Sequence, residues 1–364
     1  MAPIPRQGVV AVTGAAGYIG GWVVRGLLDR GYRVRACVRN VEDAARTDFL
    51  KAMPGFASGR LTLHAADLDQ AGCFGEVFKG CHGVAHVSHV SGYDNQDYIR
   101  GVCDHVIASV NGSGSVTRVV LTSSIAAIIS EVDIHEVSRR PVFYEDRYPD
   151  EANPRRTPDR GQGYSMGKLV AERAFAAAAE ASGQWDVVTC CPGDNVGPIQ
   201  SPHQQKGAWQ HNIETMLTGT YYQNGAYRPW MTVDVRDCAE VHIRLLESLE
   251  ARNGERIIAW SADKRNVEDI AADIDRLLPE LNLAPPELVD PFPDRVKARE
   301  AELRGIWALA ELRNDRARER LGMTFRTLDA SIRDTVESLL AIAKVQPNRR
   351  TAPAADAEVA EMVG

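Results

Sequence analysis

The chain has 364 residues, 44% of them hydrophobic and 25% charged, and its formal net charge is −7 at pH 7. This length and composition suit one large or two medium globular domains. The acidic balance argues against a nucleic-acid partner, and with no apolar run of about 18 residues and no signal-peptide pattern we expect no membrane partner and a cytoplasmic protein.

Short apolar runs alternate with helical patterns in the first half of the chain. The alternation predicts strands at residues 8–12, 33–38, 60–64, 83–87 and 118–122, with a first helix at 18–30. Such alternation builds parallel strands joined by helical crossovers. We therefore expect an α/β fold with a Rossmann-type doubly wound parallel sheet.

The pattern breaks at residues 131–163, which hold four prolines and many charges and predict a long, mostly irregular segment. Helices are expected at 165–182, 235–251, 267–278 and 328–343, strands at 185–191 and 256–260, and a charged helical segment at 295–312. From residue 347 onward, small and polar residues predict a frayed tail.

A glycine-rich motif separates the first predicted strand from the first predicted helix. Residues 13–20 read TGAAGYIG, and the strand–turn–helix context is the one that a dinucleotide-binding loop needs. Gly14 would allow the tight turn, Gly17 a close approach to a pyrophosphate, and Gly20 close helix packing. Free N–H groups at the helix start attract phosphate. The predicted cofactor-binding residues of this loop are Thr13, Gly14, Gly17, Tyr18, Ile19 and Gly20.

The residue after the second strand indicates which dinucleotide binds. NAD sites place an acidic residue there, whereas NADP sites tend to bring an arginine to the 2′-phosphate. Here the strand runs into Arg39, so we expect NADP(H). Asp67 and Leu68 follow the third strand and are expected at the adenine, although Asp67 could equally cap a following helix.

Tyr164 and Lys168 are four residues apart and lie on one face of a predicted helix. A nearby ammonium stabilises a phenolate, which lets the tyrosine exchange its proton with a substrate oxygen. Lys168 can also bond the nicotinamide ribose, so both residues are expected to contact the cofactor as well. Upstream, Ser123 and Ser124 end a predicted strand, where hydroxyls point into the cofactor crevice. We expect Ser124 to orient the substrate carbonyl, with Ser123 as the alternative and strand-end capping as a structural explanation for both.

The glycine pattern, the Ser-Tyr-Lys set and their order resemble the extended short-chain dehydrogenase/reductase family. Five further segments are similar to its dihydroflavonol-reductase-like branch of aldehyde and ketone reductases: residues 34–39, 121–124, 192–198, 233–237 and 317–323. The resemblance implies NADPH-dependent, reversible reduction of an aldehyde or ketone, with Tyr164 as proton donor and a small-molecule substrate. It also implies that Pro192, Asn195 and Val196 lie beside the nicotinamide.

The chain also departs from that branch. Residues 86–90 read HVSHV, which predicts a more polar pocket; a substrate contact for His89 and a structural role for it are both open. The residues around Tyr164 lack the pattern of cinnamoyl-CoA reductases, which argues against that substrate. Trp209, Tyr221, Tyr222, Tyr227 and Trp230 suggest an aromatic or hydrophobic substrate, or plain core packing.

The resemblance implies a domain organisation with two main parts and a tail. Residues 1–192 would form mainly the NADP(H)-binding Rossmann domain with the catalytic residues. Residues 193–345 would form mainly the substrate-binding lobe, with some strands and helices returning to the Rossmann domain, and residues 346–364 a flexible tail. A monomer and a homodimer are both compatible. Two alternative functions are an NAD-dependent nucleotide-sugar epimerase or dehydratase and a non-enzymatic cofactor sensor. Arg228, Arg236 and Arg265 are the candidates to bind the diphosphate of a nucleotide sugar.

Overall fold

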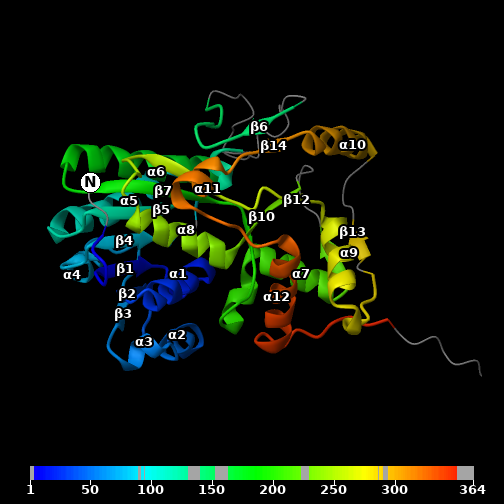
Figure 1. Ribbon diagram of the computed structural model, residues 1–364, viewed down its shortest axis with the longest axis horizontal. Coiled ribbons are helices and arrows are strands. Elements are labelled where there is room, and N and C mark those ends of the chain that lie inside the picture. The colour runs from blue at the N-terminus through cyan, green and yellow to red at the C-terminus, as the bar shows by residue number, and fades with distance from the viewer. Residues whose placement is uncertain are drawn as a thin grey trace, which may run out of the picture.

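The computed structural model describes residues 4–88, 92–93, 95–129, 140–151, 163–222, 229–285, 287–289 and 294–350. Its centre is a seven-stranded, all-parallel sheet with the order β11-β7-β5-β4-β1-β2-β3 (Figure 1). The strands are β1 (Val9–Thr13), β2 (Arg33–Val38), β3 (Leu61–Ala65), β4 (Gly83–His86), β5 (Arg118–Thr122), β7 (Asp186–Pro192) and β11 (Glu255–Ala259). The expected α/β fold with a doubly wound parallel sheet is confirmed.

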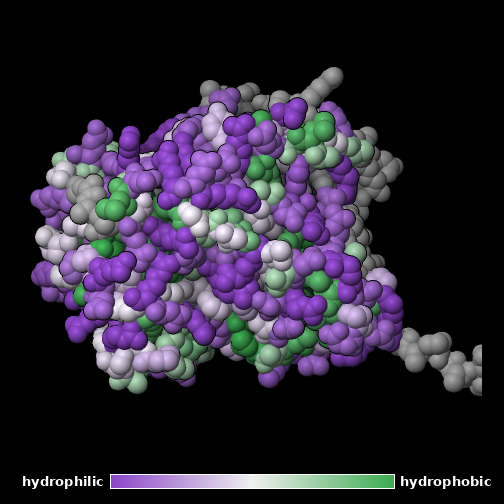
Figure 2. All heavy atoms as spheres, in the orientation of Figure 1, coloured by the Kyte–Doolittle hydropathy of each residue, from purple (hydrophilic) through white to green (hydrophobic). Residues whose placement is uncertain are grey.

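Helices cover both faces of this sheet, which explains why the central strands are apolar on both sides. On one face α1 (Tyr18–Asp29) packs against α8 (Val235–Glu247), and on the other α5 (Gln96–Ser113) packs against α6 (Tyr164–Ser182). Every residue of β5 and β7 is buried. The surface in view in Figure 2 is correspondingly largely hydrophilic, with apolar residues scattered over it.

A smaller lobe lies beside the carboxyl edge of the sheet (Figure 1). Its three-stranded sheet has the order β12-β10-β8. An apolar cluster joins the lobe's helices α7, α9 and α12. The bounds of its elements are β8 (Asp194–Val196), α7 (Ala208–Leu217), β10 (Trp230–Asp234), β12 (Lys264–Arg265), α9 (Val267–Leu277) and α12 (Leu328–Ala341).

The remaining elements complete the described chain. They are α2 (Ala44–Lys51), α3 (Pro54–Ala57), α4 (Gly75–Phe78), η1 (Ile125–Ala127), β6 (Val142–Phe143), η3 (Pro202–Lys206), β9 (Thr220–Tyr222), η4 (Pro279–Leu281), β13 (Glu287–Val289), α10 (Asp294–Ala308), β14 (Glu311–Leu312) and α11 (Asp315–Leu321). Among the helices of the described ranges, none is long and apolar enough to span a membrane.

The strand order reverses direction between β1 and β4, which lie side by side at the centre of the sheet. In sheets of this kind ligands bind outside the carboxyl ends of the strands at that point. Thr13, His86, Thr122 and Pro192 end four of these strands. The fold therefore brings the predicted glycine loop and the predicted catalytic serines to one edge.

Three sequence-based boundaries were wrong. The helix expected at 235–251 ends at Glu247, because the buried Arg118 guanidinium donates to the carbonyl oxygens of Leu245, at 3.0 Å, and Ser248. Residues 309–312 are not helical, because β14 (Glu311–Leu312) pairs in parallel with β6 (Val142–Phe143). This strand pair also adds local order to a segment that we expected to be mostly irregular.

The third correction concerns the tail, which was expected to begin at residue 346 and to have no role in folding. Asn348 N donates to Leu217 O at 2.7 Å, and Asn348 O accepts from Ala284 N at 2.9 Å. Arg350 N donates to Asn282 O at 2.8 Å. These backbone bonds fix residues 347–350 against the lobe; residues 351–364 lie outside the described ranges.

A buried ion pair joins the amino ends of β5 and β7. Arg118 Nε and one Nη each lie 2.8 Å from a carboxylate oxygen of Asp186, and the two side chains are 0% and 4% exposed. We expect Asp186→Asn to lower the free energy of unfolding by about 3–5 kcal/mol, because it leaves a buried guanidinium without its counter-charge. Urea denaturation measures the change, and Glu151→Gln at the exposed Arg173–Glu151 pair is the control, expected to change little. Equal small effects of both substitutions would contradict this reading of the Arg118–Asp186 pair.

Candidate active site

The glycine loop has the local geometry that its sequence predicts. Gly14 has φ +65°, a left-handed conformation that favours glycine. A Cβ at Gly20 would lie 2.2 Å from Gly14 O, so α1 can sit this close to the loop only because residue 20 is glycine. Gly17 precedes α1, and the N–H groups of Tyr18, Ile19 and Gly20 belong to its first turn.

Side-chain hydrogen bonds join the loop and α1 to the lobe, and sequence reasoning missed Trp22 and His203 among them. Trp22 Nε1 donates to Pro198 O at 3.0 Å, and His203 Nε2 lies 2.7 Å from Ala16 O. Tyr18 Oη donates to Gly197 O at 2.6 Å. The Tyr18 side chain therefore connects α1 to the lobe, which leaves its backbone N–H for the role that the motif predicts.

Thr13 and His86 connect the loop to the neighbouring strand. Thr13 Oγ1 accepts from Val87 N and Ser88 N, both at 3.1 Å, and lies 2.9 Å from His86 Nδ1. The hydroxyl proton therefore goes to Nδ1, which places the ring proton of neutral His86 on Nε2. Burial, with Lys168 as the second cause, lowers the pKa of His86 to about 3, so His86 stays neutral at working pH. His89 lies outside the described residues.

Arg39 directly follows β2 and is exposed, without a hydrogen bond or ion pair to any other described residue. An exposed guanidinium at the end of this strand can bind a phosphate group. Asp67 Oδ1 accepts from Asp69 N at 3.2 Å in a local turn. No helix begins there, so the helix-capping alternative for Asp67 was wrong. Leu68 packs against the core beside α5.

Tyr164 and Lys168 face one another at the start of α6. The Lys168 Nζ lies 5.5 Å from the Tyr164 ring centroid and donates to Thr122 O, the last carbonyl of β5, at 3.1 Å. Tyr164 is 39% exposed whereas Lys168 is 8% exposed. Tyr93 packs edge-on against Tyr164, with ring centroids 4.8 Å apart. The ammonium is thus fixed in the interior while the phenol faces outward.

The two serines after β5 have different environments. Ser123 Oγ donates to the buried Glu172 carboxylate, so its hydroxyl proton is already committed. Ser124 Oγ accepts from Ala126 N at 3.1 Å, and no described residue accepts its proton, which leaves a donor for a substrate oxygen. The capping explanation therefore accounts for the hydrogen bond that Ser124 Oγ accepts, but not for the one that it can donate. This difference favours Ser124 over Ser123 as the hydroxyl that orients the carbonyl.

The strand end at Pro192–Val196 carries an unused buried acceptor. Asn195 Nδ2 donates to Gly193 O at 2.9 Å, and Asn195 O accepts from Gln210 Nε2 at 2.9 Å. Asn195 Oδ1 is buried and accepts no hydrogen bond from any residue that the structure describes. Leaving a buried acceptor unpaired is costly, so a donor such as a carboxamide NH₂ fits here.

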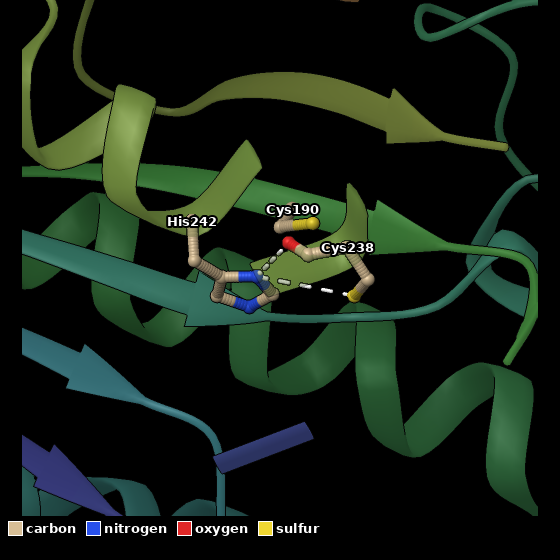
Figure 3. Close-up of side chains that lie close together, drawn as sticks. All are labelled: Cys190, Cys238 and His242. Carbon is tan, nitrogen blue, oxygen red and sulfur yellow. Dashed lines mark hydrogen bonds between the residues drawn. The ribbon is translucent and has the colours of Figure 1, made fainter. Parts of the chain in front are cut away.

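A buried polar cluster lies behind Thr122. The possible ligand atoms of Cys190, Cys238 and His242 lie within 4.8 Å of one another (Figure 3). His242 Nδ1 lies 2.8 Å from Cys238 O, which can only accept, and His242 Nε2 lies 2.6 Å from Thr122 Oγ1. Since Nδ1 must carry the ring proton for the first bond, both nitrogens are engaged. The geometry favours a structural support for the end of β5 over a metal site, and Cys190 and Cys191 are buried free thiols.

Two of the five aromatic residues expected near the substrate are part of the lobe's core. Trp209 and Trp230 pack edge-on with centroids 4.7 Å apart, and Trp230 is 5% exposed. Core packing therefore accounts for Trp230 and for much of Trp209. Tyr221 and Tyr222 lie on β9 (Thr220–Tyr222), and nothing is described of their side chains; Tyr227 lies outside the described residues.

The comparisons with known proteins decide the family. Residues 10–259 match the model of the NAD dependent epimerase/dehydratase family. The chain belongs to this family. The sequence-based recognition of an extended short-chain dehydrogenase/reductase on a Rossmann-type fold is thereby confirmed. The reductases among the similar proteins confirm its assignment as an oxidoreductase.

Similar members of the family include proteins named as reductases. The chain is 32% identical over 339 residues to cinnamoyl-CoA reductase CAD2 of Medicago truncatula, covering 91% of this chain and 95% of that protein. It is 30% identical over 286 residues to dihydroflavonol 4-reductase of Hordeum vulgare, covering 76% and 77%. A solved structure of Gre2 from Candida albicans in complex with NADPH matches with a TM-score of 0.72 at 23% identity, covering 92% of this chain and 99% of that one.

Proposed function

We propose that this protein is an NADP(H)-dependent reductase that converts an aldehyde or ketone to an alcohol, reversibly, with Tyr164 as the proton donor. The observation that carries the proposal is the placement of Lys168 between Tyr164 and the end of β5, with Nζ 5.5 Å from the Tyr164 ring centroid and 3.1 Å from Thr122 O. This edge of the sheet also carries the glycine loop.

Tyr164, Ser124 and Lys168 have separate roles in the proposed reduction. The cofactor, when bound, supplies a hydride to the carbonyl carbon. The carbonyl oxygen gains negative charge as the hydride arrives, and Tyr164 Oη gives it a proton. Ser124 Oγ donates a hydrogen bond to the same oxygen, and the Lys168 ammonium stabilises the phenolate that remains. In the oxidative direction the phenolate is the base.

The residues fit a nicotinamide dinucleotide. Thr13, Gly14, Gly17, Tyr18, Ile19 and Gly20 would hold the pyrophosphate, while Asp67 and Leu68 would lie at the adenine. Pro192, Asn195 and Val196 would hold the nicotinamide, since Asn195 Oδ1 is a buried acceptor without a partner among the described residues. Arg39, exposed and without a hydrogen bond or ion pair to another described residue, would select NADP(H) over NAD(H). The similar Gre2 structure contains NADPH, in keeping with this choice.

The substrate is a small-molecule carbonyl compound. The reductase names of the similar family members support this class. One of these names is cinnamoyl-CoA reductase, whereas the residues around Tyr164 argue against that substrate, so we propose a different aldehyde or ketone. The substrate-lobe assignment of residues 193–345, the cytoplasmic location and a monomeric or homodimeric state stay predictions.

The epimerase or dehydratase alternative receives less support. Arg236 is within 2.7 Å of Asp234 and 2.6 Å of Asp334. Arg265 is paired with Asp263 and Asp273. Both guanidinium groups are thus neutralised inside the lobe rather than poised for a sugar diphosphate; Arg228 lies outside the described residues.

A cofactor assay tests the proposal. The purified protein is mixed with NADPH, or separately NADH, and a panel of aldehydes, ketones and nucleotide sugars, while the absorbance of the reduced cofactor is followed. We expect consumption of NADPH with one carbonyl class. Conversion of a nucleotide sugar with tightly held NAD and no net consumption would overturn the proposal in favour of the isomerase alternative.

A further inference from the structure

A buried carboxylate holds the residue before Ser124. Glu172 lies one turn after Lys168 on α6 and is 7% exposed. It accepts a hydrogen bond from Ser123 Oγ. Burial raises the pKa of Glu172, and the neighbouring Arg256 opposes this shift. A carboxylate in such a place needs a counter-charge to remain ionised.

Arg256, on β11, provides that counter-charge and also holds the residues after Ser124. Its Nε lies 3.0 Å from Glu172 Oε2, and one Nη donates to Ala127 O at 2.7 Å. Ala127 ends the short helix η1 (Ile125–Ala127), whose first residue follows Ser124. Arg256 is 3% exposed, so the guanidinium is held on several sides.

The pair therefore holds the chain on both sides of Ser124: Glu172 binds Ser123, and Arg256 binds Ala127. We propose that Glu172 and Arg256 are positioning residues that fix Ser124 at the substrate carbonyl. The inference rests on the proposed function and adds to it two residues that never touch substrate. Catalysis depends on sub-ångström placement of the reacting groups. Loss of these contacts should therefore lower turnover rather than cofactor binding.

A second buried ion pair in the same sheet provides the matched control. Arg118 and Asp186 are as deeply buried, at 0% and 4% exposed. They are the first residues of β5 and β7, so they lie at the amino edge, opposite the catalytic edge. Loss of either pair weakens the fold, but only loss of the Glu172–Arg256 pair moves Ser124.

The test compares Glu172→Gln, Ser123→Ala and Asp186→Asn at a temperature where all are folded. We expect Glu172→Gln to lower kcat by about 10- to 100-fold, because an ångström of misplacement costs that much, with the Kd of NADPH unchanged. Ser123→Ala removes the contact to Glu172 but keeps the Glu172–Arg256 ion pair and the bond from Arg256 to Ala127. It should therefore lower kcat less than Glu172→Gln does. Asp186→Asn should keep the kcat of the natural protein.

A crystal structure of Glu172→Gln gives a readout that does not depend on turnover, with Ser124 and residues 125–127 expected to shift. An unmoved Ser124, or a kcat lowered equally by Asp186→Asn, overturns the inference while leaving the reductase function standing. If the natural protein reduces no carbonyl of the panel, the proposed function fails, and with it the catalytic role of Glu172 and Arg256 in positioning Ser124. Should Glu172→Gln fail to fold, Ser123→Ala decides: an unchanged kcat and an unmoved Ser124 then overturn the inference.

Discussion

Replacing Tyr164 with phenylalanine is expected to lower kcat by about 10²-fold or more, which is the range that general acid catalysis contributes. The substitution removes one oxygen atom and keeps the ring that packs against Tyr93 and lies 5.5 Å from Lys168 Nζ. The fold and the glycine loop are untouched. NADPH should therefore bind nearly as tightly as before, and the loss should appear in turnover alone.

Steady-state kinetics and a fluorescence titration with NADPH measure the two quantities. Tyr144→Phe is a matched control, because Tyr144 is 41% exposed and Tyr164 is 39% exposed, and the same atom is removed. The control should keep normal turnover. Near-normal turnover of Tyr164→Phe would remove Tyr164 from the mechanism.

Arg39→Asp should change cofactor preference by about 10²-fold, since loss of a charged hydrogen bond to phosphate is worth that order of free energy. The side chain is exposed and unpaired among the described residues, so its replacement should cost little stability. NADPH should lose most, because an aspartate repels the 2′-phosphate. NADH should be affected far less, because an acidic residue there suits the ribose hydroxyls.

Kinetics with each cofactor measure the preference, and Arg33→Asp is the control. Arg33 begins the same strand, β2, and is also exposed, but it lies at the amino edge of the sheet. It should leave both cofactors unaffected. Equal losses for NADPH and NADH in Arg39→Asp would contradict the assignment of Arg39 to the 2′-phosphate.

Local patterns predicted the sheet well because its strands are short apolar runs bounded by turn residues. Residues 33–38 and 118–122 were placed with the observed bounds of β2 and β5. The expected spacing of Tyr164 and Lys168 on one helix was also correct. Both predictions depend on residues close in sequence, where periodicity carries the information.

The sequence could not reveal contacts between distant segments. His203 lies 2.7 Å from Ala16 O across 187 positions, and Arg256 donates to Ala127 O across 129 positions. Neither residue stands in a motif, so no local pattern indicates its partner. The tail was misjudged for the same reason: the backbone of Asn348 bonds to Leu217 and Ala284, and composition alone does not show pairing of that kind.

The most direct test of the central claim is hydride transfer itself. NADPH carrying deuterium at the transferable nicotinamide position is incubated with the protein and the carbonyl compound that it consumes, and the product alcohol is analysed by mass spectrometry. We predict one deuterium on the carbinol carbon of the product, and no labelled alcohol in a sample without the protein. An alcohol without deuterium, or a rearranged substrate with the label still on the cofactor, would contradict the assignment of this protein as a carbonyl reductase.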